Sequence, residues 1–257
     1  MDRIEGDVED GDLVQVVDHH GEYLATGTLN RHSQIIVRLL TWDPQEVVDT
    51  EFWRRRLGRA LAGRTSLWAN PLTSAFRLVY AEADGLPGLI VDRYGDYWVV
   101  QCLTAGMARR RDELVALMVD PTVLNFSGSG WPVPVGIYAR DDAEVRLKEG
   151  LPLETGLLWG KEPPDRVLIQ ECGHRFWVDI KRGHKTGFYL DQRENRQRAA
   201  AYCLGAEVLN AFAYTGAFGV YAGRSGARSV INVESSAEEL ALAGENLALN
   251  GCASQEM

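Results

Sequence analysis

The most constraining feature of this chain is an apolar strand that runs directly into a glycine turn and then a helix. The strand starts at Val208, and the turn around Gly216 follows it. A second apolar strand over residues 229–233 ends in Glu234, 24 residues after Asn210. Parallel βαβ units have this order, and they hold ligands where strands end and helices begin. The pattern therefore predicts a Rossmann-like unit that binds a nucleotide-like cofactor.

The residues after the second strand support this prediction. An acid at the tip of that strand accepts hydrogen bonds from ribose hydroxyls in such units, so we expect Glu234 to hold a ribose. Ser235–Ser236 precede Glu238–Glu239, a doubled capping-box pattern that predicts the start of a helix. Asn250–Gly251 predicts its end.

The glycine spacing bears on which cofactor is bound. A dinucleotide fingerprint requires Gly-x-Gly-x-x-Gly, and this turn offers only Gly216 and Gly219. The close approach of the backbone to a pyrophosphate is therefore missing. The turn favours a cofactor without phosphates, such as S-adenosylmethionine, and an NAD-binding oxidoreductase is the less favoured alternative.

Three stretches carry a resemblance to a known family: Gly183–Arg193, Leu209–Gly216 and Asp84–Gly95. They resemble the PUA-domain class I methyltransferases that form 5-methylcytosine in 23S ribosomal RNA, and the resemblance runs over essentially the whole chain. It implies an α/β multidomain fold, with S-adenosylmethionine as cofactor and ribosomal RNA as partner. The implied parts are a PUA-like β-barrel, incomplete at its N-terminus, over residues 1–43, a linker helix and central α+β domain over 44–165, and the N-terminal part of a truncated Rossmann-like class I methyltransferase domain over 166–257.

The resemblance also implies which residues contact the cofactor. Asn210 would reach the amino-acid moiety, and Asp191 and Gln192 would bind the methionine amino or carboxylate groups. Lys185 and Arg193 would pair with a carboxylate or an RNA phosphate. An ordinary loop salt bridge is the alternative for these last four residues. The expected cofactor-binding set is Lys185, Asp191, Gln192, Arg193, Asn210, Phe212, Tyr214, Thr215, Gly216 and Glu234.

Methylation of cytosine at C5 requires a thiolate that adds to C6 and a base that removes the C5 proton. In the family, that cysteine and an Asp-Pro-Pro motif lie downstream of the second methyltransferase strand, and a His-Pro-Trp-Val-Phe strand opens the chain. None of these occurs between Met1 and Met257. We therefore expect a fragment, truncated at both ends and inactive, whose catalytic residues would lie beyond residue 257. A catalytically silent RNA-binding module is the alternative function.

Local patterns predict the remaining elements. Residues 12–40 contain three short strands with glycine turns, which suggest a small β-barrel. Residues 50–63 predict a helix, and we interpret its four arginines as a solvated face rather than an RNA contact. Further strands are expected near residues 77–80, 89–92, 97–103 and 137–140, helices over 107–119 and 194–202, and a hairpin over 168–180.

Composition bounds location and partners. The four cysteines are far apart, which argues against a zinc or other metal site and suits a reducing cytoplasm. No apolar run approaches 18 residues, so no membrane span is expected. The net charge of −9 counts against a nucleic-acid partner. Residues 166–200, however, hold eight Lys/Arg against four Asp/Glu, which suits phosphate contacts and a solvated face equally. A homodimer is left open.

Overall fold

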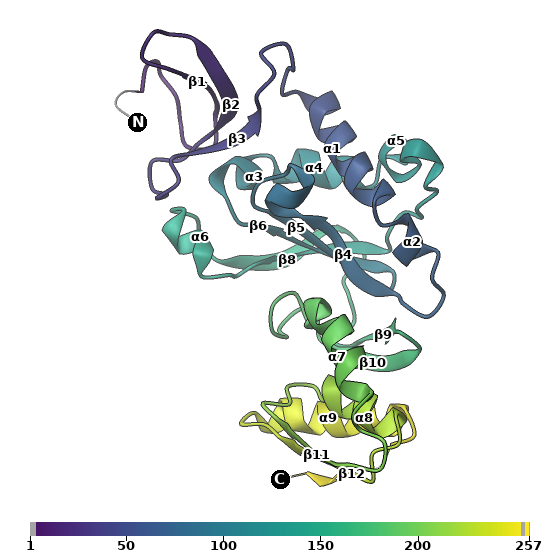
Figure 1. Ribbon diagram of the computed structural model, residues 1–257. Helices are drawn as coiled ribbons and strands as arrows, with labels where there is room; N and C mark the ends of the chain where they lie inside the picture. Colours follow the sequence, from purple (N-terminus) through teal and green to yellow (C-terminus); the bar gives the residue numbers. More distant parts are fainter. Residues whose placement is uncertain (1–3, 253–254, 257) are drawn as a thin grey trace. The chain divides into compact units, whose positions relative to one another are not determined.

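The structure, a computed structural model, describes residues 4–252 and 255–256 (Figure 1). It divides into two compact units. Unit 1 comprises the residues up to Ser66 together with Arg77–Glu162, and unit 2 comprises Leu67–Phe76 together with the residues from Pro163 onward. The expected domains 1–43 and 44–165 thus fall largely within unit 1.

Unit 1 begins with a three-stranded antiparallel sheet in the order β1-β2-β3. Its strands are β1 (Leu13–Val17), β2 (Tyr23–Leu29) and β3 (Val37–Thr41). Asp18 closes the first hairpin, because its carboxylate accepts hydrogen bonds from the backbone N–H groups of His20 and Glu22 at 2.8 and 2.9 Å. The predicted strands are confirmed. Among the described residues the sheet is open, since hydrogen bonding does not return from β3 to β1, and the incomplete barrel expected here stays a prediction.

A mixed five-stranded sheet follows, in the order β4-β5-β6-β7-β8. Strands β6 and β7 are parallel, whereas β5–β6 and β7–β8 are antiparallel. The four strands predicted from the sequence are confirmed, and β8, at the sheet edge, was missed because its glycines and its acid weaken the strand pattern. The strands are β4 (Ala75–Tyr80), β5 (Leu89–Tyr94), β6 (Tyr97–Cys102), β7 (Gly136–Asp141) and β8 (Glu154–Gly160).

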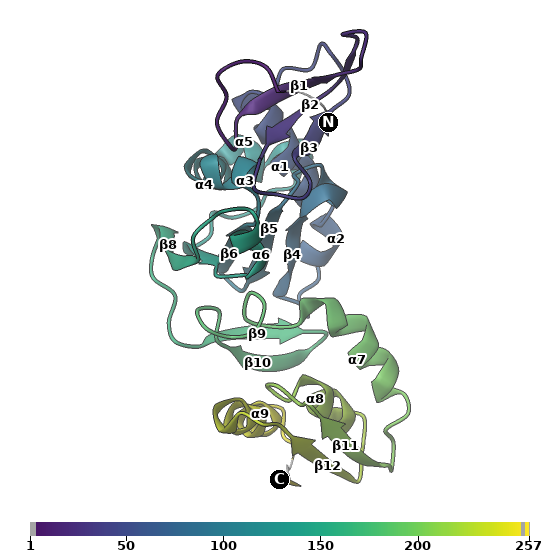
Figure 2. The same cartoon turned by 90° about the vertical axis from the view of Figure 1, so that its left-hand side faces the viewer.

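Helix α1 (Thr50–Ala62) starts where Asp49 caps it, accepting a hydrogen bond from the Phe52 N–H at 2.9 Å. Helices α1, α4 (Arg111–Met118) and α5 (Pro121–Leu124) lie together on one side of the five-stranded sheet in both views (Figures 1 and 2). The single helix predicted over 107–119 is instead two helices that meet at Arg110, whose backbone leaves the helical region. The remaining helices of this part are α2 (Thr65–Trp68), η1 (Ala81–Asp84), α3 (Ala105–Arg109), η2 (Phe126–Gly128) and α6 (Val145–Lys148).

A buried carboxylate ties the N-terminal sheet to the rest of unit 1. Glu149 accepts hydrogen bonds from Asn30 Nδ2 at 2.8 Å, Ser33 Oγ at 2.7 Å and Arg38 Nη2 at 2.9 Å. Burial raises the pKa of Glu149, but these donors outweigh it and hold the pKa below its usual range. The group is therefore ionised and paired inside the unit.

The part of unit 2 that follows Pro163 starts with the predicted hairpin, formed by β9 (Val167–Glu171) and β10 (His174–Val178). A loop then leads through η3 (Leu190–Gln192) into α7 (Arg193–Ala200), the helix predicted over 194–202. Both predictions are confirmed.

The predicted βαβ unit is present in unit 2. Strands β11 and β12 are parallel and adjacent, and β13 extends the sheet in the order β11-β12-β13. Helices α8 and α9 lie on the same face of this sheet (Figure 1). Val230 is buried beneath them, while Leu209 on the other face is exposed. The bounds are β11 (Glu207–Ala211), α8 (Ala217–Arg224), β12 (Ser229–Val233), α9 (Ala237–Leu249) and β13 (Gln255–Glu256).

Candidate cofactor site

Strands β11 and β12 end at the same edge of the sheet. Ala211 pairs with Val233 in the parallel register, and the Ala213 N–H donates to the Val233 carbonyl at 3.0 Å. The turn after β11 and the acid after β12 are therefore neighbours, which is the arrangement that places a ligand at the carboxyl ends of strands.

The Glu234 carboxylate sits among backbone N–H groups. Its Oε2 accepts from the Tyr214 N–H at 2.8 Å, and its Oε1 accepts from the Ser235 N–H at 2.7 Å and from the Ser235 hydroxyl at 3.0 Å. The Tyr214 N–H is the main cause that lowers the pKa of Glu234 below its usual range. Glu234 thus stays ionised at neutral pH and presents acceptor oxygens beside the turn.

The turn itself is held in left-handed backbone conformations. Phe212, Tyr214 and Gly216 have φ of +56°, +50° and +77°. A Cβ at Gly216 would lie 2.7 Å from the Ala243 Cβ, so both the dihedral and the contact with α9 require glycine. Phe212 is 93% exposed. Two non-glycine residues with positive φ in one turn indicate strain of the kind that collects at ligand sites.

Thr215 and the start of α8 offer polar groups to a ligand. The buried Thr215 Oγ1 has no hydrogen-bond partner among the described residues. Gly216 is the N-cap of α8 and provides no side-chain cap, so the N–H groups of the first helical turn are left for another acceptor. Both observations fit a ligand that carries hydroxyl or carboxylate groups.

Asn246, which was not predicted from the sequence, is hydrogen-bonded to the turn after β11 from helix α9. It is fully buried on α9, and its Nδ2 donates to the Thr215 carbonyl at 3.0 Å while its Oδ1 accepts from the Trp177 N–H at 2.7 Å. The available signal was an asparagine on an otherwise apolar helix face, between Leu242 and Leu247. A polar residue there has to find buried partners.

Asn210 has a different partner from the one expected. Its Nδ2 donates to Asn232 Oδ1 at 2.8 Å on the neighbouring strand. Both amides lie beneath Gly219 of α8, where a Cβ would come within 2.7 Å of Asn232 Oδ1. The Asn210 amide group is therefore directed under α8, and a contact with the amino-acid moiety of a cofactor stays a prediction.

The polar loop over residues 183–187 is hydrogen-bonded to Tyr214 in the turn after β11. The Tyr214 hydroxyl accepts from the His184 N–H at 2.9 Å and donates to the Gly187 carbonyl at 3.0 Å. A Cβ at Gly183 would lie 2.7 Å from that hydroxyl. Burial raises the pKa of Tyr214 above its usual range, so the hydroxyl keeps its proton. Tyr214 thus joins the two motifs that the sequence shows separately.

His184 packs against Tyr214. Its ring stacks on the Tyr214 ring with centroids 4.7 Å apart, and its Nε2 lies 3.2 Å from a carboxylate oxygen of Glu239. Burial raises the pKa of Glu239 above its usual range, and His184 opposes that shift. Ser236 caps α9 through the Glu239 N–H at 3.3 Å, so half of the predicted capping box is present.

Of the four loop residues expected to bind the cofactor or RNA, three contact one another: Lys185, Asp191 and Gln192. Lys185 Nζ lies 2.7 Å from Asp191 Oδ1, and Gln192 Nε2 donates to Asp191 Oδ2 at 3.3 Å. Burial raises the pKa of Asp191, but Lys185 and Gln192 hold it below its usual range. Arg193 starts α7 and pairs with no carboxylate in the described part of the chain. The loop salt bridge left open as the alternative is thus formed by Lys185 and Asp191.

A buried ion pair anchors the far end of this loop. Arg196 Nε and Nη2 donate to the two oxygens of Glu171 at 2.9 and 3.1 Å, and Nη2 also donates to the Tyr189 carbonyl at 2.7 Å. The Tyr221 hydroxyl of α8 donates to Glu171 at 3.0 Å. The sequence showed no signal for these three side chains acting together.

The cysteines of unit 2 lie away from the turn. Cys203 packs with Ala222 and Val230, Cys252 packs against Gly223 near the end of α8, and Cys172 accepts from Gln197 Nε2 at 3.2 Å. Burial raises the pKa of Cys252, and of Cys102 in β6 of unit 1, above its usual range. All four are free thiols.

Among residues 4–252 and 255–256, no helix has the length and apolar character needed to cross a membrane.

Two protein families match parts of this sequence. Residues 1–42 match the PUA-like domain family, and residues 145–255 match the S-adenosylmethionine-dependent methyltransferase family. The chain is 47% identical over 253 residues to the ribosomal RNA large subunit methyltransferase I of Tolumonas auensis, covering 97% of this chain and 61% of that protein. It is 44% identical over 250 residues to the enzyme of that name from Aliivibrio fischeri, again covering 97% and 61%.

A solved structure is also similar over most of the chain. SMU.776, which carries a methyltransferase assignment and was crystallised with SAH, aligns with a TM-score of 0.81 at 25% identity, over 96% of this chain and 60% of that one. The chain thus spans about three fifths of the length of the relatives it matches. The match of residues 145–255 to the S-adenosylmethionine-dependent methyltransferases, together with the likeness to a structure crystallised with SAH, confirms the predicted cofactor.

Proposed function

We propose that unit 2 binds S-adenosylmethionine where β11 and β12 end, and that this is the cofactor site of a ribosomal RNA methyltransferase. The observation that carries the proposal is the 2.8 Å hydrogen bond from the Tyr214 N–H to the Glu234 carboxylate, because it joins the glycine turn and the ribose acceptor in one site. The methyltransferase family match supports the reaction class, and the names of the relatives support ribosomal RNA as the substrate.

Nine of the ten expected residues have a proposed role, and a cofactor contact of Asn210 stays a prediction. Glu234 accepts hydrogen bonds from the ribose hydroxyls, while Thr215 Oγ1 and the first N–H groups of α8 donate to the cofactor. Phe212, Tyr214 and Gly216 shape the turn around it. The loop residues bind the methionine end or an RNA phosphate: Lys185, Asp191, Gln192 and Arg193. Bound S-adenosylmethionine would supply an electrophilic methyl group, and the side chains of this chain would hold and orient it.

The finer assignment is cytosine C5 of 23S ribosomal RNA in a reducing cytoplasm. It rests on the resemblance of the three motifs to the 5-methylcytosine enzymes, and the four free thiols suit such a compartment. A homodimer stays a prediction.

C5 methylation needs a thiolate at the target ring. Cys203 and Cys252 are packed away from the turn, and burial disfavours the thiolate of Cys252. The polypeptide of residues 1–257 is therefore expected to bind the cofactor without transferring its methyl group to RNA.

Isothermal titration calorimetry of residues 1–257 with S-adenosylmethionine and with NAD tests the cofactor. Binding of the first and not the second is expected, and the reverse would favour the oxidoreductase alternative. Incubation with radiolabelled cofactor and unmodified ribosomal RNA tests the second part. Methyl transfer that is lost in Cys203→Ala or Cys252→Ala would show that the nucleophile has been misplaced.

A further inference from the structure

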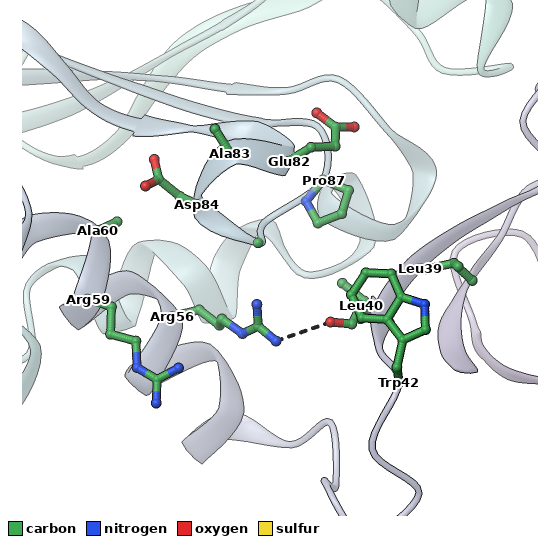
Figure 3. Close-up of a pocket in the computed structure, with 11 residues that line it drawn as sticks. Leu39, Leu40, Trp42, Arg56, Arg59, Ala60, Glu82, Ala83, Asp84 and Pro87 are labelled. Atoms are coloured by element: carbon green, nitrogen blue, oxygen red, sulfur yellow. Dashed lines mark hydrogen bonds between the residues drawn. The ribbon is translucent and has the colours of Figure 1, made fainter. Parts of the chain in front are cut away.

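A pocket of about 470 Å³ opens in unit 1 between β3, α1 and the turn after η1 (Figure 3). Its size falls in the range of small-molecule sites, about 300–1,000 Å³. Trp42, Arg56 and Arg59 line one part of it, and Glu82, Asp84 and Pro87 line the other. Asp84 and Pro87 belong to the Asp84–Gly95 motif of the sequence, for which the proposed cofactor site has no use.

Most charges around this pocket are already compensated. Arg64 binds both oxygens of Asp84 at 2.6 and 2.7 Å, and Arg38 lies 3.3 Å from Glu82. Arg56 lies 3.6 Å from Glu46.

Arg59 differs from the other arginines of α1. Arg54, Arg55 and Arg56 each face a carboxylate, as expected of a solvated helix face. Arg59 is exposed and pairs with no carboxylate among the residues that the structure describes. The pocket therefore presents one uncompensated positive charge, which favours an anionic ligand.

An exposed aromatic ring stands on the opposite side. Trp42 follows β3 directly and is 67% exposed. In Figure 3, Trp42 and Arg59 lie on either side of the pocket, with Arg56 between them. Indole is a good surface for stacking a planar ring, and such a large apolar group in water marks a contact site when it borders a pocket.

The floor between them is fixed before any ligand arrives. The Arg56 guanidinium donates to the Leu40 carbonyl at 3.1 Å and lies 4.7 Å from the centre of the Phe52 ring. Gly85, with φ of +69°, has no side chain to displace this guanidinium. A preformed floor lowers the ordering cost of binding.

We infer that this pocket binds one unpaired nucleotide of single-stranded RNA, with the base stacked on Trp42 and a phosphate paired with Arg59. Single-stranded RNA is recognised by aromatic stacking combined with cations along the backbone. A duplex cannot offer an unstacked base, and an acidic peptide would use the charge without the ring. The inference rests on the proposed function for RNA as the substrate class, and it adds a recognition site in unit 1.

The test uses residues 1–257 and a fluorescein-labelled single-stranded RNA of mixed sequence, with its duplex form as comparison. Trp42→Ala is expected to weaken single-strand binding roughly 5- to 150-fold, the usual effect of losing one stacked base. Trp42→Phe should retain most of the affinity. Arg59→Ala should weaken binding and reduce the slope of log K against log salt by about one. Lys148→Ala removes an exposed charge from α6, outside the pocket, and is the matched control.

Crosslinking with 4-thiouridine RNA, read by mass spectrometry, should label β3 or α1. Unchanged affinity in both Trp42→Ala and Arg59→Ala would overturn the inference, as would equal affinity for the duplex or crosslinks confined to unit 2. Calorimetry with S-adenosylmethionine on the same variants separates the two proposals. If residues 1–257 bind S-adenosylmethionine but not RNA, the proposed cofactor site is supported and the proposed RNA site in this pocket is wrong.

Discussion

The backbone N–H of Tyr214 donates to the Glu234 carboxylate at 2.8 Å, and the Tyr214 hydroxyl accepts from the backbone N–H of His184 at 2.9 Å. One residue therefore connects the acid after β12, the turn after β11 and the polar loop before α7. These three segments are separate in the sequence, and the predictions below follow from how tightly they are connected.

Glu234→Ala should weaken S-adenosylmethionine binding by about 1–3 kcal/mol, because a charge-assisted acceptor is lost. Calorimetry measures this directly. Glu238→Ala, which removes a charge from the first turn of α9, is the control and should leave the affinity near that of the parent. Equal affinity in parent and Glu234→Ala would mean that Glu234 serves only to organise the turn.

Tyr214→Phe should loosen the loop over residues 183–187 while keeping the ring stack with His184. The substitution leaves the His184 N–H and the Gly187 carbonyl without their partner, which costs about 1–3 kcal/mol for buried groups. Hydrogen exchange at the amides of this loop should accelerate. Tyr202→Phe, at an exposed position, should not change it. Unaltered exchange in Tyr214→Phe would show that the loop is held by other contacts.

Gly216→Ala should destabilise unit 2 for two reasons that can be separated. The left-handed backbone costs about 1–2 kcal/mol for a residue with a Cβ, and the new Cβ would press on Ala243. Gly205→Ala has a similar φ of +69° with open space around it, so it reports the backbone cost alone. Urea unfolding should rank Gly216→Ala as the less stable variant, and adding Ala243→Gly should recover part of the difference. Identical stability of the two single variants would contradict the contact.

Glu149→Gln should destabilise the contact between the N-terminal sheet and the rest of unit 1 by about 1–3 kcal/mol at neutral pH. The pKa of Glu149 is lowered in the folded protein, so its contribution is present above the unfolded pKa of about 4.3 and is lost as the pH falls through the folded pKa. The difference between parent and variant should therefore shrink below about pH 4.

Hydrogen exchange at the amides of β2 and β3, measured across this pH range, checks the Glu149 prediction. Glu144→Gln, at the exposed start of α6, is the control and should behave as the parent at every pH. A difference that stays constant down to pH 3 would show that the charge of Glu149 is not what stabilises the contact.

Several features could be predicted because they are encoded over short stretches. Each of these signals influences the backbone of only a few neighbouring residues: the apolar runs of β11 and β12, the serine before α9 and the asparagine–glycine pair after it. Local propensity and capping therefore located these elements. The same reasoning failed at Arg110, where a contact with the distant Gly11 carbonyl at 2.7 Å accompanies the break between α3 and α4.

The sequence by itself determined the parallel βαβ unit, the acid at the tip of its second strand and the cofactor class, since these depend on periodicity and residue type. Only the tertiary structure decided which side chains meet. Asn210 pairs with Asn232, Arg196 pairs with Glu171, and Trp42 and Arg59 come to line the same pocket. Such pairs join residues that are 17 to 25 positions apart in the chain. The free energy of each contact depends on burial and geometry that no local pattern contains.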